Sequence, residues 1–144
     1  MIERGVKMHI LFSKIENFAD ADSAIDFCIK QGFFKIENKF ELKSLVNEVI
    51  SHHKLKKVFE IGNKIYNEKD ILIPKKGLIR PDKVVFSETA CYVIDYKTGK
   101  PKPDDNIQIK NYSNYLESII SSPIISYLVY INETVIVKNI PKYE

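Results

Sequence analysis

The sequence Ile-Arg-Pro-Asp-Lys-Val-Val-Phe at residues 79–86, followed by Cys-Tyr-Val-Ile-Asp-Tyr-Lys-Thr at residues 91–98, decides the fold of this chain. Both stretches are rich in β-branched and aromatic residues, which favour strands. The residues between them, 87–90, read Ser-Glu-Thr-Ala and are typical of a turn. Together the two stretches predict a β-hairpin.

The register of this hairpin brings charged side chains together. If Phe86 pairs with Cys91 across the turn, counting along both strands places Asp82 directly opposite Asp95. Facing residues have Cβ atoms about 4.5–5.5 Å apart, and two carboxylates that close repel unless a cation or a proton joins them. Lys97 follows Asp95 by two positions and shares its face. The bland alternative is a cluster of surface salt bridges; the computed opposition of the aspartates favours a catalytic or metal site.

The same residues carry a family resemblance. Arg-Pro-Asp at 80–82 and Asp-Tyr-Lys-Thr-Gly at 95–99 resemble the Pro-Asp…(Asp/Glu)-x-Lys signature of the PD-(D/E)XK nucleases. The resemblance implies a restriction-endonuclease-like core and hydrolysis of phosphodiester bonds with Mg²⁺ or Mn²⁺. Asp82 and Asp95 would bind the metal and act in catalysis, as carboxylates suit these ions, and Lys97 would be catalytic.

Further matches resemble the RecB-like branch, which is found at the C-termini of bacterial DNA-repair helicases. An upstream Gly5-x-x-x-His9 and a downstream Gln108-x-x-x-Tyr112 fit that branch. The resemblance implies that His9 and the backbone carbonyl of Tyr96 are further metal ligands, and that Gln108 and Tyr112, which share a helix face, contact DNA or support the lysine. The bland readings are a structural histidine and a helix with a polar edge.

Glu68 is a further candidate acidic group, and its orientation depends on the turn at residues 74–77. If Ile73 lies opposite Leu78, Glu68 points away from the aspartates. If instead Pro74 lies opposite Leu78, Glu68 joins their face.

Basic residues and histidines elsewhere in the sequence are candidates for binding DNA or a metal ion. Lys100 and Lys102, in the loop at 99–103, can hold DNA phosphates without sequence preference, although a solvated face is the ordinary meaning of such lysines. His52 and His53 are adjacent on a predicted helix, so their side chains diverge by about 100° and are not expected to share one metal ion.

The remaining pattern predicts an α+β (α/β-like) domain, in which a mixed sheet of about five strands is flanked by helices. A helical part covers residues 1–60, and a catalytic sheet with its helix covers 61–144. Predicted helices span 2–17, 20 or 22 to 32, 38–50, 51–59, and 104 or 105 to 121. Predicted strands span 64–73, 79–86, 91–98, 124–131 and 134–140.

Composition agrees with one soluble domain, 1–144. Of the 144 residues, 44% are hydrophobic and 28% charged, and the net charge of +3 permits nucleic acid as a partner. Two cysteines cannot hold an iron–sulfur cluster of the four-cysteine kind seen in some RecB-like nucleases, and they fit a reducing cytoplasm. No apolar run reaches membrane-spanning length, and the first residues do not resemble a signal peptide.

The sequence therefore predicts a Mg²⁺- or Mn²⁺-dependent (exo)deoxyribonuclease of DNA recombination and repair. By resemblance it would be part of a larger helicase–nuclease, with DNA as substrate and a helicase motor in the same or a partner chain. The alternative from another class is a non-catalytic DNA-binding or scaffolding module on the same fold. A stand-alone or RNA-directed nuclease also stays open.

Overall fold

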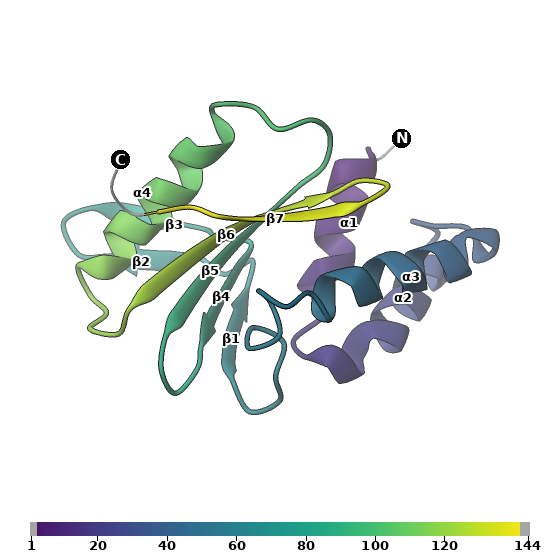
Figure 1. Cartoon of the computed structure of the whole chain (residues 1–144), viewed down its shortest axis with the longest axis horizontal. Coiled ribbons are helices and arrows are strands. Elements are labelled where there is room, and N and C mark those ends of the chain that lie inside the picture. Colours follow the sequence, from purple (N-terminus) through teal and green to yellow (C-terminus); the bar gives the residue numbers. More distant parts are fainter. Residues whose placement is uncertain (1–2, 142–144) are drawn as a thin grey trace.

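Helices cover both faces of a mixed sheet in the computed structural model, which describes residues 3–141 (Figure 1). The arrangement is α+β, as the sequence predicts. The helices are α1 (Arg4–Ser13), α2 (Ala21–Lys30), α3 (Lys39–Ile50) and α4 (Asp105–Glu117), with short 3₁₀ turns at Phe18–Asp20 and Ile36–Asn38. The strands are β1 (Lys64–Asn67), β2 (Ile71–Ile73), β3 (Gly77–Ile79), β4 (Lys83–Phe86), β5 (Cys91–Lys97), β6 (Ile124–Ile131) and β7 (Val135–Asn139).

Five strands form the main sheet in the order β1-β4-β5-β6-β7. β5 and β6 run parallel, joined by α4 as the crossover, and the other neighbours are antiparallel. The predicted mixed sheet of about five strands is confirmed. Phe86 pairs with Cys91, as predicted, so Asp82, which lies just before β4, is in line with Asp95.

The alternation of side chains along β5 builds two separate cores. Val93 faces the core beneath α4, whereas Ile94 and Tyr96 face the core beneath α1, α2 and α3. The sheet is therefore buried on both faces, and polar groups of β5 are accommodated only towards its C-terminal end. No helix within residues 3–141 is long and apolar enough to cross a membrane.

The predicted strand at 64–73 is wrong as one element. It is interrupted at Glu68, whose backbone has a φ of 50°, in the left-handed region that ends regular pairing. The second half pairs with β3 in a separate two-strand sheet, where Ile73 lies opposite Gly77. Neither predicted register of this turn occurs, because the loop has three residues and begins directly after Ile73.

The predicted short helix at 51–59 is also wrong; the segment forms a series of hydrogen-bonded turns. The Asn63 side chain donates to the carbonyls of Lys57 and Val58, which competes with helical pairing. Leu55 and Val58 are fully buried, so the segment is held by core contacts rather than by a regular helix.

Two helices are shorter than predicted. α1 ends at Ser13, and the Asn17 side chain then accepts a hydrogen bond from the backbone N–H of Ala19 to cap the next 3₁₀ turn. α4 ends at Glu117 rather than at 121. Residue 2, where the first helix was predicted to begin, lies outside the described residues.

Lys83 is the one fully buried lysine among the described residues. Its Nζ donates to the carbonyl oxygen of Ile15, 2.7 Å away, just beyond the end of α1, and lies over the ring of Phe59. Burial lowers the pKa of Lys83 to about 7, opposed by the charges of Glu16 and Asp20. The lysine thus ties β4 to the end of α1.

Replacing Lys83 by Met tests this burial. From about pH 7 to the ordinary lysine pKa of 10.5, the unfolded chain binds a proton that the native Lys83 has lost. Wild-type stability therefore gains up to about 1.4 kcal/mol per pH unit from this group as the pH rises, and loses it as the pH falls towards 7. We expect the free energy of unfolding of wild type minus that of Lys83→Met, measured in urea, to rise by about 2 kcal/mol between pH 7 and pH 9. A difference independent of pH would contradict the assignment.

Candidate metal centre

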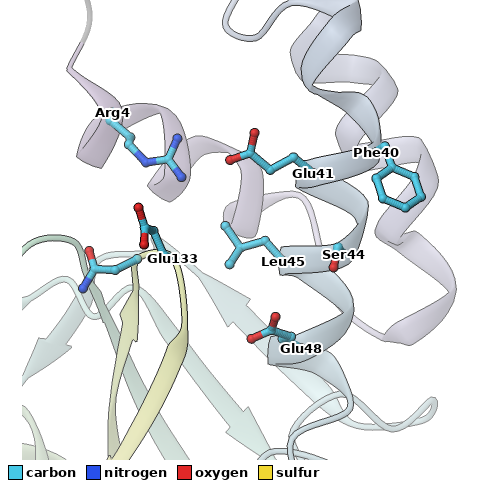
Figure 2. Close-up of a pocket in the computed structure, with 8 residues that line it drawn as sticks. Arg4, Phe40, Glu41, Ser44, Leu45, Glu48 and Glu133 are labelled. Atoms are coloured by element: carbon cyan, nitrogen blue, oxygen red, sulfur yellow. The ribbon is translucent and has the colours of Figure 1, made fainter.

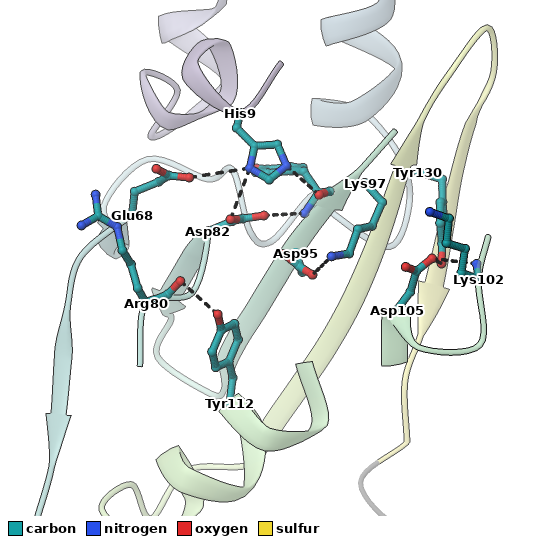
Figure 3. A network of polar contacts seen from close by, with 11 residues as sticks. His9, Glu68, Arg80, Asp82, Asp95, Lys97, Lys102, Asp105, Tyr112 and Tyr130 are labelled. Atoms are coloured by element: carbon teal, nitrogen blue, oxygen red, sulfur yellow. Dashed lines mark hydrogen bonds and ion pairs between the residues drawn. The ribbon is translucent and has the colours of Figure 1, made fainter. Parts of the chain in front are cut away.

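His9 projects from α1 towards the end of β5 (Figure 3). Its Nε2 lies 2.8 Å from the carbonyl oxygen of Tyr96. A carbonyl only accepts, so Nε2 carries the proton and Nδ1 keeps its lone pair. That Nδ1 lies 3.5 Å from Asp82 Oδ1 and 3.8 Å from Glu68 Oε1. A lone pair facing two carboxylates favours a cation or a proton between them.

Asp82 lies between this histidine and the second aspartate. Its Oδ2 accepts the backbone N–H of Tyr96 at 2.8 Å, which fixes the carboxyl group at the end of β5. Burial raises the pKa of Asp82 to about 9, helped by a side-chain hydrogen bond and charge from Asp95 and by the charge of Glu68, while the Tyr96 bond lowers it. Without a cation, Asp82 therefore keeps a proton at neutral pH.

Asp95 and Lys97 leave β5 on the same face, as predicted. Lys97 Nζ lies 3.1 Å from Asp95 Oδ2. The contact is an ion pair that lacks hydrogen-bond geometry, so this buried oxygen accepts no hydrogen bond within the described part of the chain. A buried carboxylate oxygen without such a partner has capacity left for a further ligand.

Glu68 joins the cluster, although neither predicted register of its turn occurs. Glu68 is positioned by β1 instead. Its backbone N–H donates to the Asp82 carbonyl at 2.9 Å, which continues the β1–β4 ladder by one pair. Single oxygen or nitrogen atoms of His9, Glu68 and Asp82 lie within 4.8 Å of one another. The Glu68 side chain is 36% exposed and that of Asp82 13%, so the cluster is buried at one end and open at the other.

Open space borders the exposed end of the cluster. A hollow of about 410 Å³ lies beside α1 and is lined in part by Gly5, His9, Ser13 and Glu68. A cation or a phosphate can reach the exposed atoms of His9 and Glu68 from this side.

Tyr112 of α4 approaches from the other side (Figure 3). Its hydroxyl donates to the Arg80 carbonyl at 3.3 Å. Burial, followed by the charges of Asp95, Asp82 and Glu68, raises the pKa of Tyr112, which places its hydroxyl in the field of the carboxylates. Gln108, one turn earlier on the same face, is exposed.

The loop after Lys97 is held by residues that sequence reasoning missed. The Asn132 side chain accepts the N–H of Gly99 at 2.8 Å and donates to its carbonyl at 2.9 Å. Its only sequence signal was a place in the β6–β7 turn. Lys100 and Lys102 follow on the exposed loop.

A second support for this loop is Asp105, at the start of α4. Its Oδ2 accepts the backbone N–H of Lys102 at 2.8 Å and the hydroxyl of Tyr130 at 2.7 Å. These bonds, and the charges of Lys97 and Lys102, lower the pKa of Asp105 against a raising effect of burial. The loop therefore leaves β5 along a defined path.

Gly5 lets α1 approach β5 closely. A Cβ at this position would lie 3.0 Å from Thr98 Oγ1. The group nearest to this position is therefore the Thr98 side chain. His9, one turn later, is thereby brought over the end of the strand.

A larger cleft, of about 590 Å³, lies away from this cluster, between α1, α3 and the β6–β7 turn (Figure 2). Its charged lining consists of Arg4 and three glutamates, Glu41, Glu48 and Glu133. The excess of acid disfavours a phosphate ligand there.

Comparison of the sequence with models of protein families and with curated proteins found no match. What the site can bind is therefore inferred from its side chains alone.

Those side chains fit Mg²⁺ or Mn²⁺. Carboxylates and an imidazole are ligands that these ions accept, with water completing the shell. The His9 Nδ1 that faces two carboxylates, the raised pKa of Asp82 and the Asp95 oxygen that has an ion pair but no hydrogen bond each indicate a group suited to a cation. Glu68 belongs to the closest ligand set with His9 and Asp82, while Asp95 lies beside it.

Calorimetric titration of Mn²⁺ checks the set. We expect Glu68→Gln to weaken Mn²⁺ binding about tenfold or more. Mutating even a group that only supports the ligands of a metal site typically lowers metal affinity about 10–100-fold. Glu88→Gln is the matched control, since Glu88 is exposed in the turn at the other end of β4 and β5. Equal affinity of wild type and Glu68→Gln would remove Glu68 from the site.

Proposed function

We propose that this chain is a metal-dependent nuclease domain of the PD-(D/E)XK type that hydrolyses phosphodiester bonds in DNA. The observation that carries the proposal is the convergence of His9, Glu68 and Asp82 on one point, beside Asp95 and Lys97. Three separate segments of the chain supply these groups. Structural salt bridges pair opposite charges, whereas this cluster places the carboxylates of Glu68 and Asp82 beside one imidazole, with the Asp95–Lys97 ion pair next to them.

The fold supports the same proposal. A mixed sheet with helices on both faces, and a site at the end of its central strands, is what a restriction-endonuclease-like core would provide. By the RecB-like resemblance, the partners would be DNA and a helicase motor in a cytoplasmic recombination or repair enzyme. Fold alone does not fix chemistry, so the side chains have to carry it.

In this proposal His9, Glu68 and Asp82 hold the metal, and Asp95 completes the site. The bound ion would relieve charge at the phosphate and lower the pKa of a coordinated water. Asp82, protonated at neutral pH without a cation, gives up its proton on binding. Tyr96 contributes its N–H to Asp82, while its carbonyl oxygen orients His9.

Lys97 has the catalytic role in this proposal. Its ammonium group, paired with Asp95 and partly exposed, can hold the attacking water or a phosphate oxygen. Tyr112 and Gln108 lie on the α4 side, where the DNA strand would run. Lys100 and Lys102, on the exposed loop, can contact flanking phosphates.

Replacing Lys97 by Ala should abolish cleavage of linear DNA in Mn²⁺. We expect a rate loss of about 10²–10⁴-fold, as for loss of a positioned acid–base group. No buried apolar volume is removed, but buried Asp95 loses its ion-pair partner, so the melting temperature is measured alongside to show that the variant is folded. Lys56→Ala, an exposed lysine on the turns after α3, is the control and should cut like wild type.

Two outcomes would count against the proposal. Cleavage by Lys97→Ala at the wild-type rate would refute the mechanism. A wild-type chain that binds Mn²⁺ and DNA but never cuts, even joined to a helicase motor, would favour the non-catalytic module.

A further inference from the structure

The β2–β3 hairpin carries an exposed apolar pair on its outer face. Leu72 lies directly opposite Leu78, and their side chains are 73% and 61% exposed. The inner face is anchored: Ile73 and Ile79 are buried in the core beneath α4. The two leucines therefore sit on a fixed support and are not needed to hold the hairpin in place.

The same hairpin carries an excess of basic residues. Residues 69–80 contain four basic residues and one acidic residue, a net charge of +3 that equals the net charge of the whole chain. The other residues sum to zero, and the cleft of Figure 2 has an acidic lining. The basic residues are exposed: Lys69, Lys75, Lys76 and Arg80. Residues 4–15 and 53–64 carry the same net charge of +3, but the hairpin combines this charge with an exposed apolar pair, so an anionic partner that also has apolar faces fits it.

The hairpin leads directly to the metal cluster. It keeps the register of β1 and β4: counting outward from the pair Asn67–Lys83 leads to the pair Ile71–Ile79, which is the pair observed. Glu68 and Asp82 lie in the interruption between the two ladders. Six residues separate Lys76 from Asp82, about 20 Å at the rise of a strand.

The base of the hairpin is held against α4. The Arg80 carbonyl accepts from Tyr112, and the Arg80 guanidinium lies 3.6 Å from Asp70 across the hairpin. Near the tip, Lys76 Nζ lies over the ring of Tyr115. A ligand lying along the outer face would thus lie on a hairpin that α4 contacts at its base and near its tip.

We propose that this hairpin binds the nucleic-acid strand that the metal cluster cuts, with Lys75 and Lys76 on phosphates and Leu72 and Leu78 against unpaired bases. The inference rests on the proposed nuclease function and names its substrate-binding element. Phosphates match the lysines. Base faces are apolar and accessible only where bases are unstacked, so the leucines favour single strands and frayed ends over blunt duplex.

Fluorescence anisotropy with a labelled single strand and a blunt duplex of the same sequence, in EDTA so that nothing is cut, tests the inference. Lys75→Ala/Lys76→Ala should bind both DNAs about tenfold more weakly, and its plot of log affinity against log salt should be shallower by about 1.4 for the single strand, about 0.7 for each lost phosphate contact. Leu72→Ser/Leu78→Ser should bind the single strand about tenfold more weakly with an unchanged salt slope.

Matched controls separate a local effect from a general one. Lys56→Ala/Lys57→Ala removes two exposed lysines from the turns after α3, and Phe40→Ser removes an 86% exposed ring from α3. Both should bind like wild type. Melting temperatures confirm that each variant folds.

Three results would overturn the inference. They are wild-type affinity in both hairpin variants, absence of nucleic-acid binding by wild type, and a leucine variant that changes only the oligomeric state in light scattering, which would make the surface a protein interface. Hairpin-dependent binding by a chain that never cuts would uphold the inference while the nuclease proposal fails. Cleavage by a chain whose DNA binding does not depend on the hairpin would uphold the nuclease proposal while this inference fails.

Discussion

The hydrogen bond from the His9 imidazole to the Tyr96 carbonyl determines how the helical part of the chain meets the sheet. It fixes the tautomer, so the nitrogen that faces Glu68 and Asp82 is the one with a lone pair. One helical turn earlier, Gly5 leaves room for the Thr98 side chain, which favours the close approach of α1 to β5. The lack of a side chain at Gly5 thus affects which nitrogen of His9 faces the two carboxylates.

This arrangement has an energetic cost that a cation would offset. Three carboxylates lie close together, and the native chain accommodates them without metal by holding a proton on Asp82 far above its usual pKa. A divalent ion that binds the native but not the unfolded chain replaces that proton and adds stability in proportion to the logarithm of its concentration. The site and the stability of the fold are therefore linked.

The parts of the site set by short-range geometry were predictable. A four-residue turn fixed the register of β4 and β5, and with it the positions of Asp82, Asp95 and Lys97, whereas His9 was indicated by the family resemblance alone. Glu68 was a candidate, but its position could not be predicted, because a left-handed residue inside an apparently continuous strand leaves no mark in the hydrophobic alternation. The supporting contact of Asn132 with Gly99 joins distant turns that no local pattern connects.

The two lysines that follow the aspartates have different environments, because successive side chains of a strand point to opposite faces of the sheet. Lys83 comes one residue after Asp82 and so points to the opposite face, where it is buried and donates to the carbonyl of Ile15 at the end of α1. Lys97 comes two residues after Asp95 and stays on its face, partly exposed. Helix α1 is therefore tied to the sheet at two places. His9 of the helix contacts the Tyr96 carbonyl of β5, and Lys83 of β4 contacts the Ile15 carbonyl just after the helix. With the helix so fixed, His9 lies beside the carboxylates of Glu68 and Asp82, and Lys97, paired with Asp95, stays partly exposed to a ligand.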